Sequence, residues 1–80
     1  MKIMKYPDDL TAREMEVLGY VVRGFPVKLI AAAMGISENT VNTYLRDMRS
    51  KTDVHNMREL MLYGLNIGFN REGIYTPAAA

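Results

Sequence analysis

The stretch that decides the fold reads IAAAMGISENTVNTYLR and runs from Ile30 to Arg46. Its first part predicts a helix that ends at Gly35, because glycine accepts a positive φ without steric cost. A second helix follows, with Val41 as its apolar contact one turn in. Ala31 is the small residue that two helices crossing at a steep angle require. This spacing predicts a DNA-binding helix-turn-helix, whose second helix enters the major groove. A short helical hairpin without a ligand is the alternative.

The composition limits the classes of protein to which the chain can belong. Its 80 residues make one small domain, and a hydrophobic content of 49% is enough for a core. Cysteine is absent and His55 is the only histidine, so we expect no disulfide, no metal site and no cofactor. We find no paired carboxylates, no nucleophile beside a base and no glycine-rich phosphate loop, so we expect no enzyme. Neither a membrane-spanning run nor a signal peptide is apparent, which predicts a cytoplasmic protein without a membrane partner.

The charge distribution gives only weak support for a nucleic-acid partner. The formal net charge is +1, with acidic residues concentrated near the start and cations in excess between Lys28 and Lys51. This asymmetry has the direction that DNA binding requires. A solvated charged surface would have much the same composition.

Capping signals divide the chain into four helices, so the predicted fold class is all-α. Thr11 and Glu14 have the spacing of a capping box, and Gly24 ends the helix that they begin. Ser37 and Asn56 are the expected N-caps of the third and fourth helices. We expect an N-terminal arm over residues 1–9, a domain over 10–69 with helices at about 12–23, 26–34, 38–51 and 57–68, and a flexible tail over 70–80.

The predicted fourth helix is more apolar than one buried stripe requires. It begins at Asn56, with Glu59 three residues on as the reciprocal partner of a second capping box. Its apolar residues fall on more than one face, and such a surplus favours cover by another molecule. The alternative is that Ile67 and Phe69 fold back on the core. The predicted dimer or partner face consists of Met61, Leu62, Leu65 and Phe69.

Several segments of the chain resemble the LuxR/GerE-type (NarL-like) DNA-binding domain. The resemblance covers about residues 10–69 and implies a four-helix domain that binds double-stranded DNA, usually as a homodimer. It also implies that the third helix reads the major groove and that the fourth often forms the dimer contact. The matching segments are LTAREMEVL at 10–18, KLIA at 28–31, MGISENTV at 34–41 and KTDV at 51–54, with Glu59-Leu60 and Tyr63-Gly64 in the last helix.

The resemblance also implies which side chains contact DNA. In that family, base reading falls on the positions of Asn42, Thr43 and Arg46, which helical geometry places opposite or beside the apolar stripe of their helix. Arg46 suits a guanine edge, Asn42 an adenine and Thr43 a thymine methyl group. For Arg46, a phosphate contact or a solvated charge is the alternative. The expected phosphate contacts are Lys28, Ser37, Asn39, Thr40 and Arg49.

The sequence leaves three hypotheses about function open. The first is a DNA-binding transcriptional regulator, either a stand-alone protein or a separated module. The second is a protein-binding module that pairs with a larger LuxR-type regulator through Leu62, Leu65 and Phe69. The third is a sigma-factor-like helix-turn-helix that assists RNA polymerase at DNA. Binding to random duplex DNA at low ionic strength separates the second reading from the other two.

Overall fold

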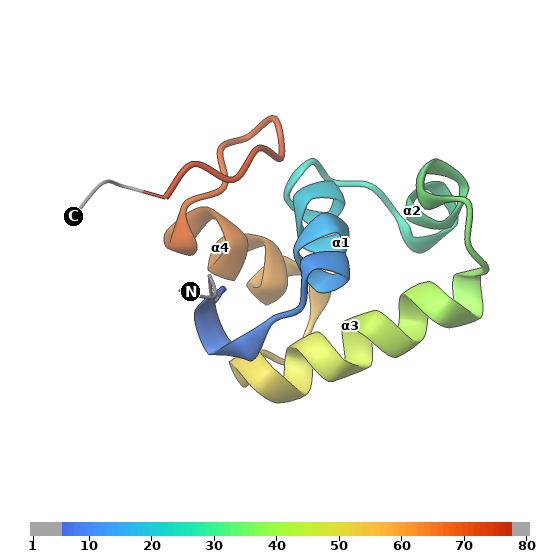
Figure 1. Ribbon diagram of the computed structural model, residues 1–80, viewed down its shortest axis with the longest axis horizontal. Helices are drawn as coiled ribbons and strands as arrows, with labels where there is room; N and C mark the ends of the chain where they lie inside the picture. The colour runs from blue at the N-terminus through green and yellow to red at the C-terminus, as the bar shows by residue number, and fades with distance from the viewer. Residues whose placement is uncertain (1–5, 78–80) are drawn as a thin grey trace, which may run out of the picture.

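The computed structural model describes residues 6–77 and places four α-helices and one short 3₁₀ turn among them (Figure 1). The all-α, four-helix prediction is therefore confirmed. Residues 1–5 of the predicted arm and 78–80 of the predicted tail lie outside the described residues. Within the described part of the chain, no helix has the length and apolar character needed to cross a membrane. The elements are η1 (Pro7–Asp9), α1 (Ala12–Val22), α2 (Val27–Met34), α3 (Glu38–Thr52) and α4 (Met57–Ile67).

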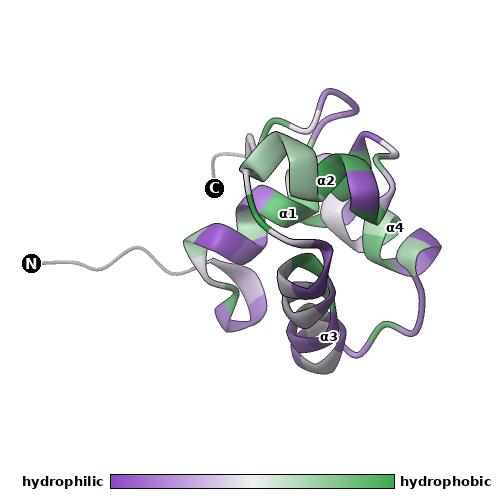
Figure 2. Ribbon diagram, turned by 90° about the vertical axis from the view of Figure 1, so that its right-hand side faces the viewer, coloured by the Kyte–Doolittle hydropathy of each residue, from purple (hydrophilic) through white to green (hydrophobic). Residues whose placement is uncertain are grey.

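Helix α1 is the centre of the molecule, because it packs against α2, α3 and α4 (Figure 1). Its buried side chains pack with those of α3 in one core, which includes Met15, Leu18, Val21 and Val22 of α1 and Val41, Leu45 and Met48 of α3. Helix α3 runs along one edge of the molecule (Figure 1), and Figure 2, which looks nearly down its axis, shows hydrophilic residues on its outer side. The arrangement leaves one side of α3 to solvent. The fully buried side chains include Val17, Leu18, Ile30, Val41, Leu45, Met48 and Leu60.

The first capping box forms as predicted, and the second forms only in part. Thr11 Oγ1 accepts from Glu14 N at 3.1 Å, and Glu14 Oε1 accepts from Thr11 N at 2.8 Å. Asn56 likewise accepts from Glu59 N at 2.9 Å. The Glu59 carboxylate, however, accepts from His55 N at 2.7 Å and not from the cap residue. Asn56 is more extended than Thr11, with a φ of −153° against −81°, and the N–H within reach belongs to the preceding residue.

Several helix ends lie next to a glycine or a proline, and the helix bounds differ from the predicted bounds by at most one residue. Gly24 and Gly35 adopt the predicted positive φ, at 83° and 68°. Pro26 is the N-cap of α2 and not its first residue, since its φ is −72° with an extended ψ of 165°. Helix α3 continues to Thr52 because the left-handed residue that ends it is Asp53. Helices α1 and α4 each end one residue earlier than predicted.

Residues 70–77, which the composition assigns to a flexible tail, have a defined course in the structure. They turn back onto the domain, with Asn70 N donating to Ile74 O at 2.9 Å and Thr76 N donating to Gly68 O at 2.8 Å. The turn reaches the backbone of α1, where a Cβ at Gly19 would lie only 2.8 Å from the Gly73 carbonyl oxygen. Two glycines far apart in sequence thus allow the contact. The glycine at 73 is part of a docked turn and not a sign of disorder.

The described part of the N-terminal arm is also folded onto the helices. Residues 7–9 form a 3₁₀ turn in which Asp8 and Asp9 both have positive φ, at 56° and 59°. Aspartate tolerates this conformation better than most residues. The Tyr63 hydroxyl donates to Asp8 Oδ2 at 2.7 Å, and burial together with this bond raises the pKa of Tyr63. The turn therefore joins α4 to the beginning of the chain.

Candidate nucleic-acid interface

Helices α2 and α3 form the predicted helix-turn-helix. At the end of α2, Ile36 N donates to Ala31 O at 3.0 Å, the bond that closes a helix around a left-handed glycine. Ser37 then caps α3, with its Oγ accepting from Thr40 N at 3.1 Å. Ala31, the small residue predicted for the crossing of the two helices, is buried, with 5% of its surface exposed. The turn thus fixes where α3 begins relative to the core.

The solvent side of α3 brings together the three predicted base-reading residues. Asn42, Thr43 and Arg46 are exposed and lie within about a third of the helix circumference, at roughly 100° per residue. Together with two of the predicted phosphate contacts they line one shallow, open hollow. Its lining residues are Asn39, Asn42, Thr43, Arg46 and Arg49.

Thr43 has a fixed orientation within this hollow. Its hydroxyl donates to the Asn39 carbonyl oxygen at 3.0 Å, one turn earlier in α3. Because the hydroxyl is turned to the helix backbone, the γ-methyl group is the part left for a partner. An apolar group of this kind suits a thymine methyl better than a polar base edge.

The predicted phosphate contacts fall into separate environments. Ser37 and Thr40 bond to each other, with 2.9 Å between their hydroxyl oxygens, so capping accounts for both. Lys28 is exposed on α2 and does not line the hollow. Arg49 is half-buried, and its Nε is buried with no hydrogen-bond partner in the described part of the chain. Of the five predicted phosphate contacts, Lys28 and Asn39 are the two that are exposed and take no part in capping α3.

The predicted partner face of α4 is only partly present. Phe69 is only 6% exposed and stacks on Tyr75 with 5.1 Å between ring centroids, so its assignment to a partner face is wrong. Phe69 belongs to the core, as the fold-back alternative predicts, and Tyr75 of the C-terminal turn lies against it. Met61 is half-buried against the core. Leu62 and Leu65 remain, at 55% and 37% exposed.

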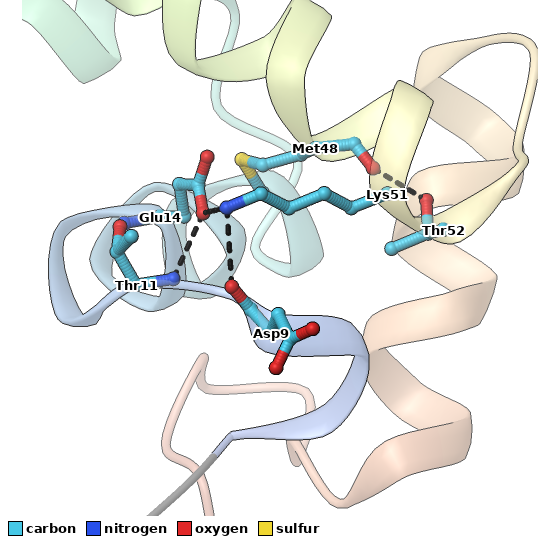
Figure 3. A network of polar contacts seen from close by, with 6 residues as sticks. All are labelled: Asp9, Thr11, Glu14, Met48, Lys51 and Thr52. Carbon is cyan, nitrogen blue, oxygen red and sulfur yellow. Dashed lines mark hydrogen bonds and ion pairs between the residues drawn. The ribbon is translucent and has the colours of Figure 1, made fainter.

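A polar network at the C-terminal end of α3 was not predicted from the sequence (Figure 3). The Lys51 ammonium donates to Glu14 Oε1 at 2.8 Å and to the Asp9 carbonyl oxygen at 3.1 Å. Glu14 is 2% exposed. Burial by itself raises the pKa of Glu14, but hydrogen bonds from Lys51 and from the Thr11 backbone outweigh it, and the net shift is downward. The capping box signals a role for Glu14, whereas nothing near Lys51 in sequence points to its partner.

Comparison with known proteins gives the same assignment as the fold. The family model for bacterial regulatory proteins of the luxR family matches residues 8–63. The monoamine regulon transcriptional regulator of Klebsiella aerogenes is 47% identical over 55 residues, which are 69% of this chain and 24% of that protein. Transcriptional activator protein ExaE of Pseudomonas putida is 39% identical over 62 residues, covering 78% of this chain and 29% of that protein. No solved structure matches.

A third relative is the nitrate/nitrite response regulator protein homolog of Haemophilus influenzae. It is 46% identical over 48 residues, which are 60% of this chain and 23% of that protein. The chain thus spans about a quarter of the length of these relatives. The names of the first two describe regulators of transcription, and the name of the third describes a response regulator. With the helix-turn-helix in place and the family match extending over most of the chain, this protein belongs to the luxR family of bacterial regulatory proteins.

Proposed function

We propose that the chain binds double-stranded DNA in a sequence-specific manner and regulates transcription, with α3 in the major groove. The observation that carries this proposal is the solvent side of α3. Asn42 and Arg46 are exposed there, and neither side chain makes a hydrogen bond within the described part of the chain. A helix face with free amide and guanidinium groups matches the donors and acceptors that base edges present.

The proposed contacts divide between base edges and phosphates. Arg46 pairs with a guanine edge and Asn42 with an adenine edge, while the Thr43 methyl contacts a thymine methyl. Phosphates lie against Lys28, Asn39 and Arg49, and against the α3 N-terminus capped by Ser37 and Thr40.

The proposed assembly is a homodimer through α4, and the binding unit is residues 10–69 with both terminal turns packed on it. The dimer surface rests on Leu62 and Leu65, which are the exposed large apolar residues of α4. Two leucines make a small surface, so we expect association to be weak without DNA. In a longer regulator or at RNA polymerase, the same surface is available to another protein.

Selection of bound duplexes from a random pool tests the proposal directly. The wild type is expected to enrich one motif, and a matched Asn42→Ala/Arg46→Ala variant is expected to lose it while keeping its helical content. Light scattering of the bound and free protein measures the dimer in parallel. If the wild-type pool stays random and no salt-dependent binding occurs at low ionic strength, the protein-binding alternative holds instead.

A further inference from the structure

Helix α3 is held at its two ends by different parts of the molecule. Its N-terminal part packs against α2, and its C-terminal part lies near η1 and the beginning of α1 (Figure 1). Lys51 is the last residue but one of α3. Its ammonium group bonds both Glu14 in α1 and the Asp9 carbonyl in η1 (Figure 3). One side chain therefore ties the end of α3 to two other segments.

Lys51 leaves α3 on the side away from the candidate interface. Lys51 follows Asn42 by nine positions, so at roughly 100° per residue it points about 180° away from Asn42 and about 140° away from Arg46, although only about 80° from Thr43. The Lys51 side chain is 32% exposed, and that of Glu14 is 3% exposed. This cation is directed into the fold and not toward the face that carries Asn42 and Arg46.

We propose that Lys51 is a positioning residue for DNA reading. By tying the end of α3 to Glu14 and to the Asp9 carbonyl, it fixes the direction in which Asn42 and Arg46 point, and it makes no contact with DNA. This inference rests on the proposed function of α3.

The energetics of buried ion pairs favour orientation over stability as the result of this contact. Desolvation of the Glu14 carboxylate cancels part of its attraction to Lys51, and water screens the partly exposed ammonium, so the pair contributes little net stability. Any tilt of α3 that separates the pair, however, leaves the Glu14 carboxylate buried without its cation. The free-energy cost therefore arises when α3 moves away from its position in the fold. A reading helix needs such a constraint, because bidentate base contacts depend on orientation.

The first test compares affinity for the selected duplex with affinity for a scrambled duplex, at a temperature where every variant is folded by circular dichroism. Lys51→Met is expected to weaken binding to the selected duplex by at least about fivefold, the scale of one lost base contact. Binding to the scrambled duplex should change by less than about twofold, and the salt dependence should stay the same. Glu14→Gln keeps the cap and is expected to act in the same direction with a smaller effect.

Arg71→Met is the matched control, because it removes one exposed cation from the C-terminal turn without touching the network. It should leave the ratio of the two affinities as in the wild type. Equal weakening on both duplexes with a reduced salt slope would make Lys51 a phosphate contact. An unchanged ratio in Lys51→Met would make it a purely structural residue. Either result overturns the proposal.

The second test does not depend on DNA binding. Since the chain has no cysteine, Glu16→Cys in α1 and Ser50→Cys in α3 allow two spin labels to be placed. The distance distribution between the labels should broaden or shift in the Lys51→Met background. An unchanged distribution contradicts a positioning role. If the wild type does not bind DNA, the proposed function fails, while this distribution still decides whether Lys51 orients α3.

Discussion

At the scale of single residues, Arg46 and Lys28 are proposed to make two different kinds of DNA contact. Arg46 lines the hollow on α3, whereas Lys28 lies on α2 outside it. A residue that reads a base affects one position of the site, and a residue that binds phosphate affects all sequences alike.

Arg46→Ala is expected to cost about 1–3 kcal/mol on the selected duplex and to relax the preference at one base pair. Lys28→Ala should instead weaken all duplexes by a similar factor and reduce the salt slope by about one. Anisotropy titrations on a set of single-base variants of the site measure both effects. If Arg46→Ala leaves affinity and selectivity unchanged, Arg46 does not read a base.

At the scale of helices, the crossing of α1 and α4 depends on the absence of a side chain at Gly64. A Cβ there would lie 2.6 Å from Val22 Cγ2 and 3.1 Å from Leu18 Cδ1. Gly64→Ala is therefore expected to destabilise the domain by about 1–3 kcal/mol, even though alanine favours the helix itself. Urea unfolding measures the change. Adding Val22→Ala should recover part of the loss, and a stabilised Gly64→Ala variant contradicts the crossing.

The end of α4 gives a second prediction at this scale. Phe69, two residues after the end of α4, is buried under the C-terminal turn, while Leu62 is exposed on α4. Phe69→Ala should cost about 3–5 kcal/mol in unfolding free energy, the range for a buried aromatic residue. Leu62→Ala, the control, should stay within about 0.5 kcal/mol of the wild type in the monomer. Equal effects of the two changes contradict the placement of Phe69 in the core.

The features that sequence predicted are those with local signals. Capping residues such as Thr11 and Ser37 mark helix starts within three residues, and the spacing of apolar residues marks the buried side of α3. The solvent side of α3 follows from the same spacing, whereas the expected roles of Asn42, Thr43 and Arg46 on it come from the resemblance to the family. Contacts between segments that are far apart in the chain have no local sequence signal that predicts them. Lys51 meets Glu14 from 37 residues away, and the glycine-containing turn over 70–77 docks on α1.

At the scale of the whole molecule, the buried Glu14 carboxylate couples folding to pH. The folded-state pKa of Glu14 is lowered, so its contribution to stability is fully present above the unfolded value of about 4.3. That contribution is lost as the pH falls through the folded-state pKa. Urea unfolding between about pH 6 and pH 3 should therefore show a steeper loss of stability in the wild type than in Glu14→Gln. Parallel curves for the two proteins contradict this role of Glu14.

The preference for a selected duplex over a scrambled one, measured over a range of salt concentrations, tests the central claim of the account most directly. The claim is that the polar side of α3 recognises a duplex sequence, in a molecule whose net charge is only +1. Anisotropy titrations of the wild type, from low to moderate salt, compare the selected duplex with a scrambled one. We predict binding to both that weakens with salt, and a preference for the selected duplex of at least about tenfold that persists. Equal binding to the two duplexes at every salt concentration would contradict the account.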